Sequence, residues 1–122
     1  MKILGIGVDI VENSRIGKLL KNKLFIKRMF SNSEILIANK IKDKKGYYSK
    51  RFAAKEAFAK SIGTGFRDDF NFNDISIVSD KLGKPSFTIN KKINKIVKKK
   101  FKTNSFNFFL SISDEKKYSI AY

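Results

Sequence analysis

The 122-residue sequence contains no cysteine and no histidine. Without cysteine, the chain has no disulfides, no thiolate nucleophile and no cysteine-based zinc site. Without histidine, Ser-His-Asp and Cys-His catalytic groups are excluded as well. Any chemistry that this protein performs must therefore use carboxylates, amines or hydroxyls.

Acidic residues are scarce, with 11 Asp and Glu against 27 Lys and Arg, which gives a formal net charge of +16. Such an excess predicts an anionic partner or substrate: nucleic acid, a phosphate-rich small molecule, an acidic protein or a membrane surface. A composition rich in Lys, Asn and Ile throughout explains the same charge without any ligand, so both interpretations stay open. The hydrophobic content of 42%, with twelve Phe and four Tyr, is enough for a core and predicts a folded chain.

Long apolar runs are also missing. Asp9 and Glu12 interrupt the opening MKILGIGVDIVEN well before the roughly 20 residues that a membrane span requires. The same segment lacks the small-residue cleavage pattern of a signal peptide. We therefore expect a cytoplasmic protein without a membrane span, folded as one domain over residues 1–122.

The hydrophobic pattern predicts an α+β fold in which a long Ala-rich helix packs on a small antiparallel sheet. The helix is YYSKRFAAKEAFAKSI, residues 47–62, with Gly63 as its stop. Asn13 or Ser14 is expected to cap an earlier helix, and Ser31 and Glu34 have the spacing of a capping box. The other predicted elements are a strand over 2–11, helices over 15–23, 25–30 and 31–41, a loop over 43–46, and hairpin strands over 75–78 and 86–89. A short basic helix capped by Asn90 and running to about 101 follows, and then a closing hairpin of 106–113 with 118–122.

Two carboxylates stand out. Asp9 lies in an apolar, glycine-bearing strand, where an unpaired charge is costly, so it is expected to be an ion-pair partner or a metal ligand. Glu56 lies four residues before Lys60, a spacing that is also typical of an exposed helical ion pair. If the fold brings Asp9 and Glu56 together, they offer the hard oxygen ligands that Mg²⁺ prefers, with waters and substrate phosphates completing its shell.

Positive charge on the Ala-rich helix favours phosphoryl transfer at such a site. Lys60, Lys55 and Arg51 are expected to surround the metal and neutralise charge. Gly63-Thr64-Gly65 could present backbone N–H groups to a phosphate, or could be only a helix cap and turn.

An acidic helix could dock on the basic segment near the N-terminus, where lysines and arginines alternate with apolar anchors. The alternative is a core face with solvated lysines behind it. The segment contains Arg15, Lys18, Leu19, Leu20, Lys21, Lys23, Phe25, Lys27, Arg28 and Met29.

Three motifs occur together in a known order: GIGVDIVENSR near the start, RFAAKEAFAKSIGTG in the centre and SISDEKKYSIAY at the end. In these motifs and their order, the chain resembles the holo-acyl-carrier-protein synthase family of 4′-phosphopantetheinyl transferases, and the resemblance extends over essentially its full length. The resemblance implies Mg²⁺-dependent transfer of the phosphopantetheine arm of coenzyme A to a serine of apo acyl carrier protein. Adenosine 3′,5′-bisphosphate would be released, and the product would serve fatty acid and lipid biosynthesis.

The resemblance also implies roles for individual residues. Asp9, Glu56 and Lys60 would be catalytic, with Asp9 and Glu56 as the Mg²⁺ ligands, and the base would be a metal-bound water or Glu56 acting through a water. Family members usually form trimers with the active site between chains. The residues implied to bind coenzyme A are Arg51, Lys60, Gly63, Thr64, Gly65, Gly83, Lys84, Pro85 and Ser113, and those implied to bind the carrier protein are Arg15, Phe25 and Arg28.

One position departs from the family pattern, because Asp114 stands where the family has histidine. A carboxylate there is expected to repel a phosphate, unless Lys116 compensates or Asp114 points away. A catalytically weakened binder of coenzyme A or carrier protein is therefore one alternative. A basic nucleic-acid-binding module is another, although the chain has no RNP signature, zinc-finger spacing or helix-turn-helix pattern.

Overall fold

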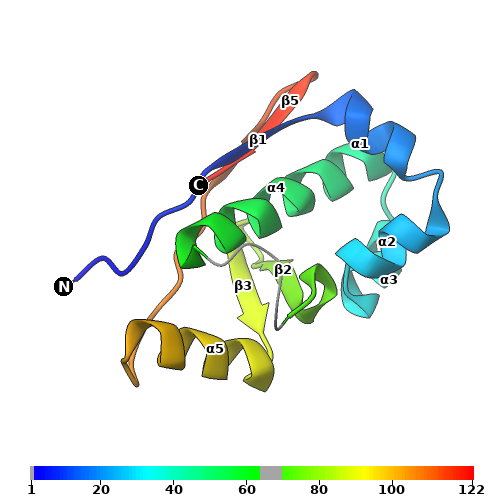
Figure 1. Cartoon of the computed structure of the whole chain (residues 1–122). Coiled ribbons are helices and arrows are strands. Elements are labelled where there is room, and N and C mark those ends of the chain that lie inside the picture. Colours follow the sequence, from blue (N-terminus) through cyan, green and yellow to red (C-terminus); the bar gives the residue numbers. More distant parts are fainter. Residues whose placement is uncertain (1, 64–69) are drawn as a thin grey trace.

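The computed structural model describes residues 2–63 and 70–122. The predicted α+β fold is confirmed (Figure 1). Within the described ranges, no helix is both long and apolar enough to cross a membrane. The elements are β1 (Asp9–Glu12), α1 (Asn13–Leu19), α2 (Lys23–Met29), α3 (Asn32–Ala38), α4 (Lys44–Ile62), a 3₁₀ turn η1 (Phe72–Asp74), β2 (Ile75–Ser79), β3 (Pro85–Ile89), α5 (Lys91–Phe101), β4 (Ile112–Asp114) and β5 (Tyr118–Ala121).

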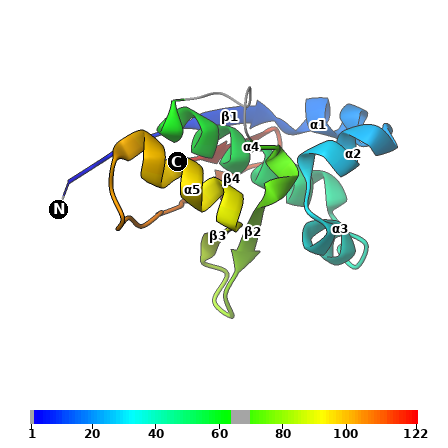
Figure 2. The same cartoon turned by 60° about the horizontal axis from the view of Figure 1, so that its bottom comes forward.

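The strands form two antiparallel sheets. The first has the order β1-β5-β4, and in it Asp9 pairs with Ala121, which also pairs with Ile112. The second is the β2–β3 hairpin, which projects away from β1 in Figure 2. Both hairpins were predicted from the sequence and are confirmed, but the closing hairpin is shorter than predicted, because residues 106–111 are not in a strand and β4 covers only Ile112–Asp114. The first strand is shorter than predicted, because residues 2–8 have no strand pairing and β1 begins only at Asp9.

Helix α4 lies between these layers, with β1, β5 and α1 on one side and β2 and α3 on the other (Figure 1). It begins at Lys44, because the side chain of Asp43 caps it by accepting a hydrogen bond from the N–H of Gly46 at 3.0 Å. The predicted loop over 43–46 was therefore wrong. Gly63 ends the helix as predicted, with the left-handed φ of 78° that glycine adopts without strain.

The predicted cap of the first helix was also wrong. Helix α1 begins at Asn13 itself, whose buried side chain turns away from the helix end. It donates to the carbonyls of Glu115 and Lys116 at 3.0 and 3.2 Å and accepts from the hydroxyl of Ser119 at 2.7 Å. Asn13 therefore fastens α1 to the turn between β4 and β5.

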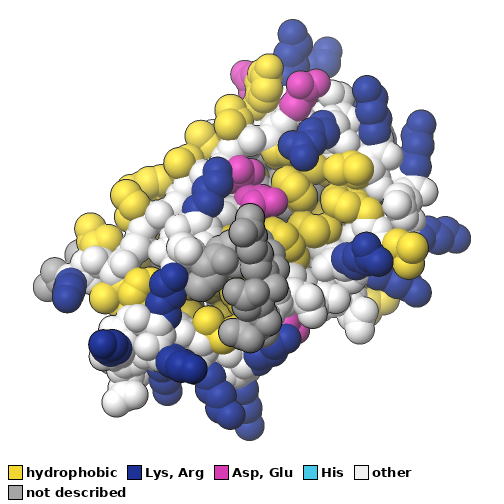
Figure 3. Space-filling view, viewed as in Figure 1, with side chains coloured by type: hydrophobic (Ala, Val, Ile, Leu, Met, Phe, Trp, Pro, Cys, Tyr) yellow, Lys and Arg dark blue, Asp and Glu magenta, His cyan; other side chains and the backbone are white. Residues whose placement is uncertain are grey.

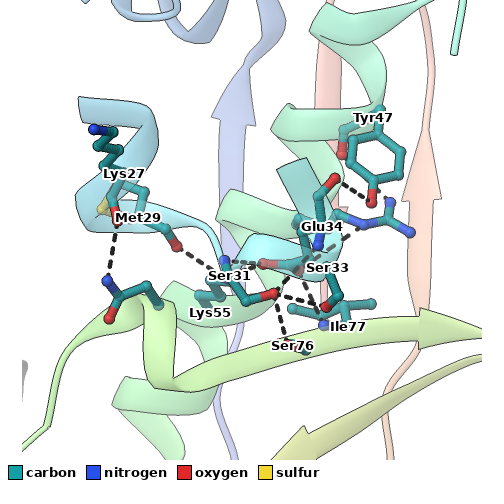
Figure 4. Close-up of polar contacts among 11 residues, drawn as sticks. Lys27, Met29, Ser31, Ser33, Glu34, Tyr47, Lys55, Ser76 and Ile77 are labelled. Carbon is teal, nitrogen blue, oxygen red and sulfur yellow. Dashed lines mark hydrogen bonds and ion pairs between the residues drawn. The ribbon is translucent and has the colours of Figure 1, made fainter. Parts of the chain in front are cut away.

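The predicted capping box of Ser31 and Glu34 is confirmed, and its carboxylate does more than cap α3. Glu34 is 1% exposed and accepts from the N–H groups of Ser31 at 2.9 Å and Ile77 at 3.0 Å, and from the ammonium of Lys55 at 2.5 Å. The Lys55 ammonium also donates to the Met29 carbonyl at 2.7 Å (Figure 4). One buried ion pair thus joins α2, α3, α4 and β2.

This ion pair corrects the expectation that Lys55 surrounds a metal. Lys55 is 0% exposed, and its ammonium makes both of the core hydrogen bonds just described. Burial lowers the pKa of Lys55 to about 8, and the adjacent Glu34 carboxylate opposes that shift. Lys55 therefore stays protonated at neutral pH and serves the fold.

Removing this ammonium should strongly destabilise the protein. We expect Lys55→Met to lower the free energy of unfolding in urea by about 3–5 kcal/mol, because Glu34 would remain buried and charged. Adding Glu34→Gln to Lys55→Met should recover part of the loss, since the buried carboxylate is then neutral, and the remaining Arg51 guanidinium keeps its contact with the Tyr47 ring. Lys44→Met, at an exposed position of the same helix, is the matched control. A Lys55→Met protein within about 1 kcal/mol of that control would contradict this account.

Candidate active site

Asp9 and Glu56 come from different elements and meet beside Lys60. Asp9 is the first residue of β1, and Glu56 and Lys60 lie one turn apart on α4. The Lys60 ammonium donates to a carboxylate oxygen of Asp9 at 3.2 Å and to the Val8 carbonyl at 3.0 Å. The Asp9 side chain is 16% exposed and that of Lys60 is 56% exposed, so the carboxylate is sheltered while the cation reaches into solvent.

Asp9 is close enough to Glu56 for its charge to affect the ionisation of Glu56. Burial raises the pKa of Glu56, and the charge of Asp9 raises it further, while Lys60 and Arg15 oppose the shift. Burial also raises the pKa of Asp9, against the hydrogen bond and charge of Lys60 and the charge of Arg15. Figure 3 shows acidic side chains gathered in the middle of this face, with basic side chains spread around them. A second cation would relieve the repulsion that the pair carries.

These residues fit a magnesium ion better than a metal held by protein ligands alone. In the part of the chain that the structure describes, no group of three or more His, Cys, Asp or Glu side chains could hold a metal. Mg²⁺ commonly binds through one or two carboxylates and keeps its remaining positions for waters and substrate phosphates. Asp9 and Glu56 could supply those two carboxylates.

Arg51 does not join this group. Its guanidinium lies 3.6 Å from the centre of the Tyr47 ring and 4.0 Å from the Glu34 carboxylate, and the residue is 8% exposed. Burial lowers the pKa of Arg51, against the effects of Tyr47 and Glu34. The predicted contact between Arg51 and coenzyme A is therefore not supported by its place in the core.

The other residues implied to bind coenzyme A are dispersed. Gly63 ends α4 just beyond Lys60, and the predictions for Thr64 and Gly65 fall outside the described residues. Pro85 is the first residue of β3, and the turn before it contains Gly83, with a φ of 86°, and Lys84. It lies at the tip of the projecting hairpin (Figure 2). The exposed Ser113 lies on β4, which β5 separates from β1. Within one chain, neither segment completes the group around Asp9.

The residues predicted to hold a carrier protein lie on α1 and α2. Arg15 and Arg28 are exposed, while Phe25 is half-buried and packs against Phe30 and Phe52, with ring centres 6.1 and 6.2 Å away. Arg15 also acts on the site, because its charge lowers the pKa of both Asp9 and Glu56. Sequence reasoning missed this second effect, although the position of Arg15 in the first turn after β1 was a usable signal. The Val8 carbonyl, which binds Lys60, could not be inferred from any side-chain pattern.

Comparisons with known proteins find relatives over nearly the whole chain. Residues 5–122 match the family model of the 4′-phosphopantetheinyl transferase superfamily. The chain is 74% identical to the holo-[acyl-carrier-protein] synthase of Pelagibacter ubique (strain HTCC1062), covering 100% of this chain and 95% of that protein. It matches the crystal structure of the Neisseria meningitidis synthase with a TM-score of 0.88 and 38% identity, over 98% and 95% of the two chains. It matches the Helicobacter pylori synthase in complex with coenzyme A with a TM-score of 0.78 and 32% identity, over 95% of each chain.

The raised pKa values of the acidic pair predict a cost to stability at neutral pH. An acid whose pKa is raised by folding favours the folded state below its ordinary pKa, 3.8 for Asp and 4.5 for Glu, and loses that contribution as the pH rises through the raised value. In metal-free buffer at pH 7, we expect Glu56→Gln to raise the melting temperature by about 3 °C, and the gain should vanish near pH 4.

The exposed Glu115→Gln is the control for the general effect of removing a negative charge. Addition of Mg²⁺ should raise the melting temperature of the wild type and leave Glu56→Gln unchanged. A Glu56→Gln protein that melts at or below the wild-type temperature at pH 7 would show that the pair is not repulsive.

Proposed function

The chain belongs to the 4′-phosphopantetheinyl transferase superfamily as a holo-[acyl-carrier-protein] synthase, and from this premise we propose a Mg²⁺-dependent mechanism in which Asp9 and Glu56 hold the metal. The enzyme transfers phosphopantetheine from coenzyme A to acyl carrier protein. Release of adenosine 3′,5′-bisphosphate, a role in fatty acid and lipid biosynthesis and a cytoplasmic location belong to the proposal. The observation that carries it is the meeting of Asp9, Glu56 and Lys60 at one sheltered point.

In the proposed reaction, the serine oxygen of the carrier protein attacks the phosphorus that bears the phosphopantetheine arm. A new P–O bond forms to serine, and the bond from that phosphorus to the bridging oxygen of the pyrophosphate breaks. The leaving group is adenosine 3′,5′-bisphosphate. The serine proton passes through a water molecule to the Glu56 carboxylate, since the chain has no histidine to accept it. When bound, Mg²⁺ would offset the negative charge that builds on the leaving group.

Lys60 has the reach to assist the same step. Its side chain is 56% exposed and makes its contact with Asp9 through the ammonium alone. If the Asp9 carboxylate holds a metal ion, the Lys60 ammonium could therefore turn from Asp9 to a pyrophosphate oxygen. Lys60 would then neutralise charge on the pyrophosphate. A charged lysine stabilises a phosphate oxygen more strongly than an uncharged hydrogen-bond donor does.

The carrier protein is proposed to bind over α1 and α2. Arg15 and Arg28 are exposed cations on these helices, and Phe25 supplies an apolar surface between them in the sequence. Arg15 acts electrostatically on both acidic residues, so a carrier docked on α1 would bring its serine next to them. Acyl carrier proteins are acidic and coenzyme A is polyanionic, and a chain with a net charge of +16 should attract both at low ionic strength.

A direct test incubates the protein with apo acyl carrier protein, coenzyme A and Mg²⁺ and weighs the carrier by mass spectrometry. We expect a gain of one phosphopantetheine that is abolished by chelation and by Glu56→Gln at every pH, because the variant lacks both a metal ligand and the proton acceptor.

Glu115→Gln is the matched control and should retain transfer. Activity of Glu56→Gln would exclude the proposed role of Glu56. Binding of coenzyme A by the wild type without any mass gain would favour the weakened form suggested by Asp114, which is exposed at the end of β4.

We also propose that the enzyme is a homotrimer in which a neighbouring chain completes each site. A groove of about 950 Å³ lies between the N-terminal segment and residues 101–111. Several large apolar residues around this region are exposed. They include Ile3 at 72%, Ile6 at 67%, Phe109 at 81% and Tyr122 at 64%. Exposed apolar residues beside a groove suit a subunit interface. Coenzyme A bound at one chain would then be contacted by residues of the neighbouring chain, namely Gly83, Lys84, Pro85 and Ser113.

Complementation between two inactive variants tests the shared site. Glu56→Gln should inactivate the metal side, and Ser113→Trp should block the coenzyme side. Each site would take its metal side from one chain and its coenzyme side from the next. In random trimers from equal co-expression, about one site in four would combine two intact sides, so about one quarter of wild-type activity should return. Sedimentation should give the mass of a trimer. A monomer by sedimentation, with no recovery of activity on co-expression, would contradict the shared site.

A further inference from the structure

Two glycines before β1 touch the backbone of α4. A Cβ atom built on Gly7 would clash with the Ala57 carbonyl oxygen, at a distance of 1.9 Å. A Cβ atom built on Gly5 would clash with the Ser61 carbonyl oxygen, at a distance of 2.0 Å. Both neighbouring groups are helix backbone, which cannot turn aside as a flexible side chain can. Only glycine permits this approach at either position.

The spacing of the two contacts sets the direction and register of the segment. Two residues of extended chain span about 6.6 Å, and four residues of helix rise about 6 Å, so the steps from Gly5 to Gly7 and from Ser61 to Ala57 nearly match. The segment therefore runs antiparallel to α4. Asp9 lies two residues after Gly7, so it reaches the next turn of α4 toward the helix N-terminus. Glu56 is the last residue of that turn. This agrees with the electrostatic effect of Asp9 on Glu56.

Positions 5 and 7 require glycine because there is no room for a side chain, and not because of an unusual backbone conformation. The glycines with positive φ among the described residues are Gly63 and Gly83, so Gly5 and Gly7 adopt angles that other residues share. An alanine at position 7 would therefore change the structure only through its added methyl group. Because Val8 and Asp9 follow directly and both bind the Lys60 ammonium, any displacement at Gly7 reaches the acidic pair.

We propose that Gly7 is a positioning residue for Asp9, an inference that rests on the proposed metal-dependent function. Its missing side chain lets the backbone lie on α4 and so holds the Asp9 carboxylate within reach of Glu56. A methyl group there would lift the segment between Gly5 and Asp9, while β1 stays paired with β5 at Ala121. The Asp9 carboxylate would then move away from Glu56, and a shared divalent cation would be bound less tightly.

The test compares three Gly→Ala variants by Mn²⁺ affinity, measured from free Mn²⁺ by electron paramagnetic resonance, and by melting temperature. Gly7→Ala should weaken Mn²⁺ binding about tenfold or more. Gly5→Ala creates a similar clash farther from Asp9, so it should lower the melting temperature by a similar amount but weaken binding less than about threefold. Gly17→Ala is the neutral control, because its Cβ would meet only the Lys45 side chain, at 3.0 Å.

A rescue separates positioning from a general loss of structure. Asp9→Glu should weaken Mn²⁺ binding in the wild-type background, but it should strengthen binding in Gly7→Ala, because the longer side chain restores the reach that the lifted backbone has lost. Equal effects of Gly5→Ala and Gly7→Ala on Mn²⁺ affinity, wild-type affinity in Gly7→Ala, or a Gly7→Ala protein that does not fold at 25 °C would each overturn the proposal. A wild-type protein that binds no Mn²⁺ would instead refute the proposed metal site, on which this inference rests.

Discussion

The structure depends on keeping two carboxylates together although they repel each other. Asp9 and Glu56 are both partly buried, and burial together with their mutual charge raises the pKa of Glu56 above its ordinary value. Such a pair is costly in a protein without a ligand, because ionised groups prefer solvent. It becomes useful when the ligand is a cation that carries phosphates. Under the proposed function, the pair lowers the stability of the ligand-free protein and favours binding of a cation, which is common where an active site is preorganised.

Contacts on two sides of α4 hold the pair in place. On one side, the segment before β1 lies on the helix backbone through Gly5 and Gly7. On another, the Lys55–Glu34 ion pair fixes α4 to α2, α3 and β2. Adjacent residues of one helix thus have opposite tasks, since Lys55 serves the core and Glu56 serves the site. The same helix presents Lys60 to the solvent side, where its ammonium contacts Asp9 and the Val8 carbonyl.

The sequence predicted the elements whose signals are local. Four such predictions are confirmed: the Ala-rich helix with its Gly63 stop, the Ser31–Glu34 capping box, the hairpin of β2 and β3, and the Asn90 cap of α5. Errors arose where a side chain serves a distant partner. Asn13 has the residue type of a cap but binds the turn of the β4–β5 hairpin 102 residues away. Lys55 and Arg51 belong to a basic helix by sequence, yet Glu34, from another helix, draws both into the core.

Anomalous diffraction from crystals containing Mn²⁺ is the most direct measurement of the central claim. The account predicts one peak per chain, bonded to a carboxylate oxygen of Asp9 and to one of Glu56, with the remaining positions filled by waters or by phosphate oxygens of coenzyme A. A peak that touches only one of these side chains, or that lies elsewhere on the molecule, would contradict it.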